Sequence, residues 1–229
     1  MHLLDEPVGF RILLEGPDQG LGLFVRLRVQ KGRREAKGEL VLGVKSRTGK
    51  RREAITVEKM ASQRMDDPTR DGVDLGPQAR RDLRDELHDQ VRRSVEAGAR
   101  LALGGQVPER AGAWYPPGVL CGVKPGMAAF DEELFGPVAA VTRARSEEEA
   151  IEFANRSPFG LGAAVFTADL ARGERIAAEQ LEAGAAFVNA FVASDPRLPF
   201  GGIKESGYGR ELSDLGIREF VNQKTVVVG

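Results

Sequence analysis

Residues 138–189 decide the fold, because short apolar stretches alternate there with amphipathic ones: VAAVTRARSEEEAIEFANRSPFGLGAAVFTADLARGERIAAEQLEAGAAFVN. VAAVTRA (138–144), AAVFT (163–167) and AAFVN (185–189) are short and apolar, which predicts three strands. Strands that alternate with helices are typical of a parallel or mixed sheet with helices packed on its faces. The sequence therefore predicts an α/β fold.

Capping signals mark where the two intervening helices begin. Ser146 is followed three residues later by Glu149, which is the pattern of a capping box. The second helix is expected over residues 169–182, opened by Asp169 and followed by Gly184 just past its end. Its inward-facing residues are predicted to be Leu170, Ala177 and Leu181.

Further elements are predicted on either side of this stretch. Residues 78–97 predict a helix that ends before Gly98, which suits a C-terminal cap. Its apolar stripe consists of Leu83, Leu87, Val91 and Val95. LALGG (101–105) predicts a short buried strand with a turn, and TVVVG (225–229) predicts a strand that closes the chain.

Length and composition indicate a globular protein. The chain has 229 residues, 41% of them hydrophobic and 29% charged, which suits one large or two small domains. The net charge of −1 argues against a general nucleic-acid or membrane-surface binder. No apolar run approaches the roughly 18 residues of a membrane-spanning helix. A single cysteine cannot form an intrachain disulfide, which favours a cytoplasmic location. Two histidines leave little room for zinc chemistry, so no metal site is predicted.

Composition changes near residue 55. Residues 1–54 are treated as an unassigned basic N-terminal segment, either irregular or loop-like, since residues 26–53 carry many basic residues and no sustained period. Residues 26–53 contain one short apolar run, ELVLGV (39–44), which is a strand candidate. Residues 55–229 are predicted to form a packed α/β domain.

Four motifs carry a family resemblance, in the order in which that family has them. They are MDDPTRDGVDLGP (65–77), YPPGVL (115–120), FDEELFGPVAAV (130–141) and DPRLPFGGIKESGYGRE (195–211). Together they resemble the C-terminal, catalytic-domain part of the aldehyde dehydrogenase superfamily, over roughly residues 57–229. The resemblance implies a truncated aldehyde dehydrogenase catalytic domain, with its oligomerisation strand at the C-terminus. FVASDPRLPFGG (191–202) is most similar to the succinate-semialdehyde branch.

The resemblance also implies roles for four residues. Glu133 would bind the hydroxyls of the nicotinamide ribose, for which a carboxylate offers two acceptor oxygens. Phe135 would pack beside the nicotinamide, although a plain core position is an open alternative. Ser194 would contact the distal carboxylate of the substrate, and Phe200 would line the aldehyde pocket. Arg197 lies close enough to assist, with a solvent-facing charge as the alternative reading.

The nucleophile that the resemblance calls for is missing. Family members attack the aldehyde with a cysteine thiolate, pass hydride to NAD or NADP, and use a glutamate base to activate water. By resemblance that cysteine would fall near residue 36, where the sequence reads KGRREAKGEL. Cys121, in YPPGVLCGVKPG, is predicted to be a small buried hydrophobe. We therefore assign no catalytic residue and expect weak or absent cofactor binding and little or no activity.

Three functions remain open at this point. The first is NAD(P)-dependent oxidation of an aldehyde, with succinate semialdehyde as the expected substrate and a homo-oligomer as the expected assembly. The second is a non-catalytic interaction protein that pairs with an intact, related dehydrogenase subunit through the C-terminal strand. The third is nucleic-acid binding through residues 26–53, which lack the interleaved aromatic residues that such sites use.

Overall fold

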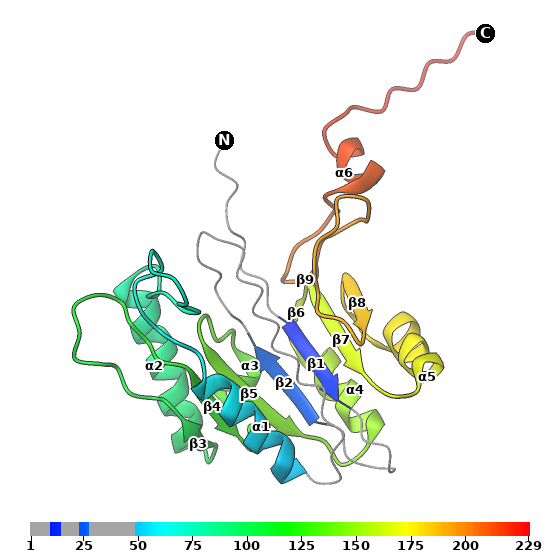
Figure 1. The fold of residues 1–229 in the computed structure, drawn as a ribbon. Helices are drawn as coiled ribbons and strands as arrows, with labels where there is room; N and C mark the ends of the chain where they lie inside the picture. The colour runs from blue at the N-terminus through cyan, green and yellow to red at the C-terminus, as the bar shows by residue number, and fades with distance from the viewer. Residues whose placement is uncertain (1–9, 15–22, 28–48) are drawn as a thin grey trace.

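The chain folds around one seven-stranded sheet, seen here in a computed structural model that describes residues 10–14, 23–27 and 49–229. The strand order is β3-β4-β5-β2-β1-β7-β8, and a separate small sheet pairs β6 with β9 (Figure 1). In chain order the strands are β1 Phe10–Leu14, β2 Leu23–Leu27, β3 Arg100–Leu103, β4 Gly118–Cys121, β5 Val138–Arg143, β6 Phe159–Gly160, β7 Gly162–Phe166, β8 Ala185–Val188 and β9 Ile203–Lys204. The sheet is mixed, because β2 and β3 run against the other five strands.

Helices cover both faces of this sheet, which confirms the predicted α/β fold. The helices are α1 Gly49–Ala61, α2 Arg81–Glu96, α3 Ala128–Asp131, α4 Glu147–Arg156, α5 Leu170–Arg175 with its π-helical continuation η1 Ile176–Gln180, and α6 Ser213–Arg218. Because side chains alternate along β4 and β5, each strand contributes residues to two hydrophobic cores, one on each face of the sheet. Leu120 and Val138 pack with α2 and α3 on one face, while Val119 and Val141 pack with Met60 of α1 on the other.

Two strands of the sheet come from residues 1–54, the segment that the sequence leaves unassigned. β1 pairs in parallel with β7, and β2 pairs antiparallel with both β1 and β5. The two strands thus stand between β5 and β7 and join the two parts of the sheet. The strand candidate at 39–44 lies outside the described residues. The domain boundary at residues 54/55 stays a prediction, and helix α1 runs across it.

The predicted capping signals are present in the structure. Ser146 Oγ accepts a hydrogen bond from the Glu149 backbone N–H at 3.2 Å, at the start of α4. Asp169 likewise accepts from the Arg172 backbone N–H at 3.0 Å, at the start of α5. Gly98 follows α2 with a φ of +105°, a conformation that glycine adopts without strain.

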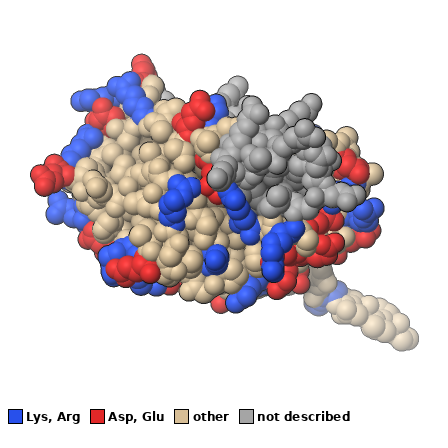
Figure 2. Space-filling model, turned by 90° about the horizontal axis from the view of Figure 1, so that it is seen from below, with Lys and Arg blue, Asp and Glu red and all other residues tan. Residues whose placement is uncertain are grey.

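Two predicted details are wrong, each because the tertiary environment differs from the local pattern. Val95 is 38% exposed and Leu170 is 60% exposed, so neither belongs to an inward stripe. Residues 101–103 lie in an edge strand and are exposed or half-buried. The C-terminal strand TVVVG (225–229) is expected to pair with another subunit and stays a prediction; in the single chain these residues leave the body as an extended arm (Figures 1 and 2).

Candidate active site

Glu133 and Phe135 lie on the short segment that connects α3 to β5. Both side chains are half-buried. The segment approaches α2 so closely that a Cβ atom on Gly136 would lie within 2.4 Å of Leu87 Cδ2 and 2.5 Å of Gln78 Nε2. Only glycine therefore fits at position 136, and this close approach to α2 fixes the path of the chain that carries Glu133 and Phe135.

The neighbouring Glu132 is held by α2. Arg93 donates two parallel hydrogen bonds to its carboxylate, Nη1 to Oε1 at 2.7 Å and Nη2 to Oε2 at 2.8 Å. The Arg93 guanidinium, followed by the Gln90 amide, lowers the pKa of Glu132 below its usual range. The structure therefore gives Glu132 a partner on α2.

Ser194 and Phe200 lie on the long loop that follows β8. Asn189 turns the chain there with a φ of +52°, and its side-chain amide bridges the backbone N–H and C=O of Thr167 at 2.9 Å each. This bridge ties the end of β8 to the end of β7. Ser194 itself is exposed, and Phe200 is half-buried.

Arg197 is occupied by its neighbour. Its Nε and Nη2 donate to the two carboxylate oxygens of Asp195, at 2.9 and 2.6 Å, and its backbone N–H donates to Asp195 as well. Asp195 thereby neutralises the Arg197 guanidinium, and this guanidinium lowers the pKa of the Asp195 carboxyl below its usual range. Arg197 is thus paired with Asp195 and not with the carboxylate of a substrate. The suggestion that Arg197 assists Ser194 thus requires this pair to open.

The segment that contains Phe200 folds back as a compact block over residues 200–211. Phe200 and Glu211 exchange backbone hydrogen bonds at 2.9 and 2.7 Å, and β9 pairs with β6 just ahead of β7. Ser206 Oγ accepts from the backbone N–H of Gly160 at 3.0 Å, and Lys204 Nζ lies 2.6 Å from Glu182 Oε2. These contacts dock the block at the edge of the sheet where β7 begins.

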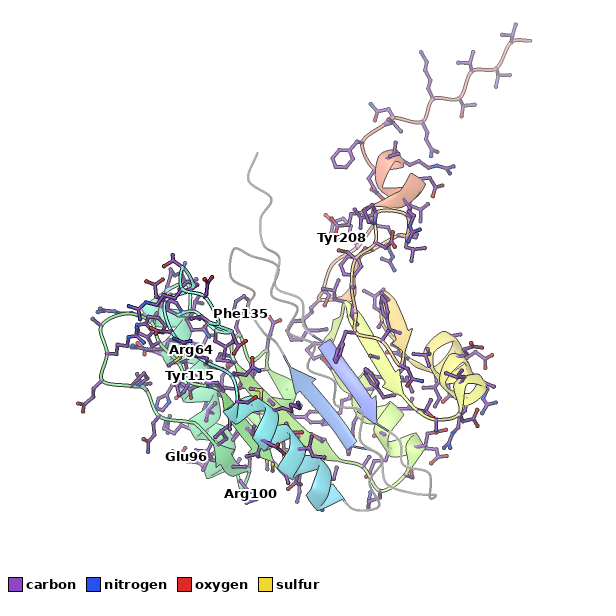
Figure 3. All side chains as sticks on the ribbon, in the orientation of Figure 1. Arg64, Glu96, Arg100, Tyr115, Phe135 and Tyr208 are labelled. Carbon is purple, nitrogen blue, oxygen red and sulfur yellow. The ribbon has the colours of Figure 1, made fainter. Side chains whose placement is uncertain are left out.

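The two pairs of candidate residues therefore lie at the same edge of the sheet. Glu133 and Phe135 precede β5, and the block with Phe200 docks where β7 begins. Ser194 follows Val192, which lies against Gly162 at the start of β7. Figure 3 shows Phe135 and Tyr208, a residue of that block, on this side of the molecule. Because β2 and β1 intervene, three strand spacings separate β5 from β7, roughly 14 Å.

Cys121 does not take part in this arrangement. It ends β4 on the face covered by α1, is 2% exposed and packs with Val119 and Val141. Burial, and after it the nearby carboxylate of Glu53, raises the pKa of the Cys121 thiol to about 11. The prediction of a small buried hydrophobe is confirmed at this position.

Sequence reasoning did not identify the polar residues of α2 that hold the Glu-Glu segment, Gln90, Arg93 and Ser94. The signal was present, since positions 87, 90, 91 and 94 share one helix face and two of them are polar. His88 of the same helix is half-buried, with Nδ1 at 3.3 Å from the Tyr115 hydroxyl. Burial raises the pKa of Tyr115 to about 12.

The described residues contain no cluster of His, Cys, Asp and Glu that could hold a metal ion. Across the same part of the chain, none of the helices has the length and apolar character that a membrane span requires. Basic and acidic side chains are interspersed on the face that Figure 2 presents.

A sequence model described as the aldehyde dehydrogenase family matches residues 40–226. The chain belongs to the aldehyde dehydrogenase family. The family signal thus begins before residue 57, where the recognisable motifs begin.

Curated relatives extend the similarity to one branch of this family. The chain is 52% identical over 170 residues to a succinate semialdehyde dehydrogenase [NAD(P)+] of Escherichia coli, covering 74% of this chain and 37% of that protein. It is 47% identical over 173 residues to a succinate-semialdehyde dehydrogenase [NADP(+)] of Mycobacterium avium, covering 76% and 36%. The resemblance to the succinate-semialdehyde branch is therefore confirmed, although the chain spans little more than a third of these relatives.

Solved structures show the same fold. A Streptococcus pyogenes succinic semialdehyde dehydrogenase in complex with NADP+ matches with a TM-score of 0.74 and 35% identity, over 78% of this chain and 39% of that one. A Mycobacterium tuberculosis aldehyde dehydrogenase in complex with NAD+ matches with a TM-score of 0.74 and 34% identity, over 79% and 37%.

Proposed function

We propose that this chain supplies the nicotinamide-ribose contact and part of the aldehyde pocket of an NAD(P)-dependent succinate-semialdehyde dehydrogenase, and that alone it has little or no activity. The observation that carries the proposal is the placement of both candidate pairs at one edge of the sheet, in a chain 47–52% identical to enzymes named for this substrate. The catalytic cysteine is not among its residues.

The side chain of Glu133 suits a nicotinamide cofactor. A bound NAD(P) would supply the hydride acceptor, and a carboxylate is an acceptor-only group that suits two adjacent ribose hydroxyls. Glu133 stands on a segment fixed by Gly136 and by α2, so its backbone is positioned before any ligand arrives. Phe135, half-buried two residues later, would limit the space beside the nicotinamide.

The substrate side rests on Ser194 and Phe200. The exposed hydroxyl of Ser194 can donate one hydrogen bond to a distal carboxylate, while the half-buried ring of Phe200 offers an apolar wall to the carbon chain. With Arg197 paired to Asp195, selectivity for a carboxylate would depend mainly on hydrogen bonding.

The test combines turnover and binding on the purified chain. With succinate semialdehyde and either NADP+ or NAD+, we expect no cofactor reduction above background and only weak cofactor binding, which Glu133→Gln weakens further. Turnover that survives Cys121→Ala would show that another group performs the chemistry. Turnover that Cys121→Ala abolishes would make the buried thiol the nucleophile and overturn the proposal of an inactive chain.

A second candidate function is pairing with an intact dehydrogenase subunit in the cytoplasm. The exposed large apolar residues are concentrated near the C-terminus, and those beyond residue 200 are Tyr208, Leu215, Ile217, Phe220, Val221, Val226, Val227 and Val228. An extended arm of this kind can add a strand to another sheet. Co-purification with an intact subunit that is lost on deletion of residues 225–229 would support this role, and a stable isolated monomer would contradict it.

A further inference from the structure

Helix α2 buries two polar side chains in a face that is otherwise apolar. Gln90 is 4% exposed and Ser94 is fully buried, and they lie among Leu87 and Val91. A buried polar group is costly unless it is hydrogen-bonded, so such residues mark a contact that the fold requires. Among the described residues, the hydrogen bonds that join these side chains to another element reach residues 129–133.

Ser94 and Gln90 hold the two ends of that segment. Ser94 Oγ accepts a hydrogen bond from the Ala129 backbone N–H at 2.9 Å, at the start of α3. The side-chain amide of Gln90 donates to the Glu132 carboxylate and to the backbone carbonyl oxygen of Glu133, at 3.1 Å each. Both N–H groups of this amide are thereby used, and one of them fixes the main chain at Glu133.

Arg93, a half-exposed residue of the same helix, also binds this segment. Its bidentate bond to Glu132 is charge-assisted and planar, a geometry that fixes direction as well as distance. Downstream, Gly136 is wedged against α2, and the chain then enters β5 at Val138. The segment that contains Glu133 and Phe135 is therefore pinned upstream by side chains of α2 and downstream by the sheet.

We infer that Gln90 is a positioning residue for cofactor binding: with Arg93, it fixes the main chain at Glu133 and so aims the Glu133 carboxylate and the Phe135 ring. This inference rests on the proposed function. It assigns different tasks to two adjacent glutamates, since Glu132 anchors the segment to α2 and Glu133 meets the ligand. It also extends the site to a helix that none of the four candidate residues belongs to.

The test compares Gln90→Leu with Arg92→Gln in the full chain. Leucine keeps the bulk of the side chain and removes both donors. Arg92 lies on the same helix but bonds Asp89 and Glu96 of that helix, so its replacement is a matched control. Amide hydrogen exchange of residues 129–135 is measured without ligand, with β7 amides as a folding reference, and NADP+ binding is measured by titration calorimetry.

Gln90→Leu should speed exchange of the amides at 132–135 and weaken NADP+ binding about tenfold, which corresponds to about 1.4 kcal/mol of binding free energy. Arg92→Gln should change neither quantity. If Gln90→Leu also speeds exchange in β7, Arg93→Gln replaces it, since that change loosens Glu132 from a half-exposed position.

Each other outcome overturns a distinct statement. Unchanged exchange at 132–135 would show that α2 does not hold the segment. Faster exchange with unchanged NADP+ affinity would reduce Gln90 to a structural residue and overturn the positioning role. If the unmodified chain neither binds NADP+ nor gains protection at 129–135 in its presence, the proposed function fails, and this inference fails with it.

Discussion

Cys121 should behave as an unreactive thiol as long as the chain is folded. The side chain is 2% exposed beneath α1, and burial raises its pKa from 9.0 to about 11. Each pH unit changes the thiolate fraction tenfold, so at neutral pH this shift lowers the reactive fraction about a hundredfold relative to an exposed cysteine. Exclusion of the reagent by the helix slows the reaction further, because labelling then requires local opening.

The assay is the rate of alkylation by iodoacetamide at neutral pH, in buffer and in urea that unfolds the chain. We expect the folded rate to be at least about a hundredfold lower. Since Cys121 is the only cysteine, Cys121→Ala gives the zero-labelling control. Equal rates in buffer and urea would refute the reasoning, because they would require an accessible thiol with an ordinary or lowered pKa.

Three further predictions concern what holds the fold together. Glu53→Gln should lower the free energy of unfolding by about 2 kcal/mol relative to Glu58→Gln, an exposed position on the same helix, because buried Glu53 pairs with the two arginines Arg100 and Arg143; urea denaturation checks this. Gly184→Ala should cost about 3 kcal/mol in the same assay, because the added methyl group would collide with the Gly201 carbonyl oxygen. Asp66, whose pKa is lowered from 3.8 to about 2 by the Asp67 backbone N–H and then by Arg110, stabilises its loop above pH 3.8, so the protection of residues 64–75 against amide exchange, taken relative to the intrinsic exchange rate at each pH, should fall as the pH falls toward 2.

The elements with strong local signals could be predicted from the sequence. The strands β5, β7 and β8 follow short apolar stretches, and the starts of α4 and α5 follow from Ser146 and Asp169, because a cap is a contact within one turn. The role of Gln90 could not be predicted in this way. Its partners Glu132 and Glu133 lie 42 and 43 residues away, and no local period records such a contact.

The edge strand β3 accounts for one of the wrong details. A helix or strand pattern states which residues are apolar, but the neighbour that covers them is set by topology. Leu101 is apolar yet exposed, in a strand that pairs with β4 alone in the described sheet. TVVVG has the composition of a strand, but a strand forms only with a partner, and TVVVG pairs with none of the described strands of the single chain.

The strands β1 and β2 determine how the candidate site is assembled in this chain. Glu133 depends on β5 and α2, whereas Phe200 depends on β6, β9 and the start of β7. β5 and β7 do not pair with each other in the described sheet, where β2 and β1 stand between them. The separation of β5 from β7 is therefore set by two strands of the N-terminal segment, while Glu133 and Phe200 are each held by contacts on their own side. If the proposed roles hold, substitutions around Glu133 should change cofactor binding without changing the substrate side, and substitutions around Phe200 should do the reverse.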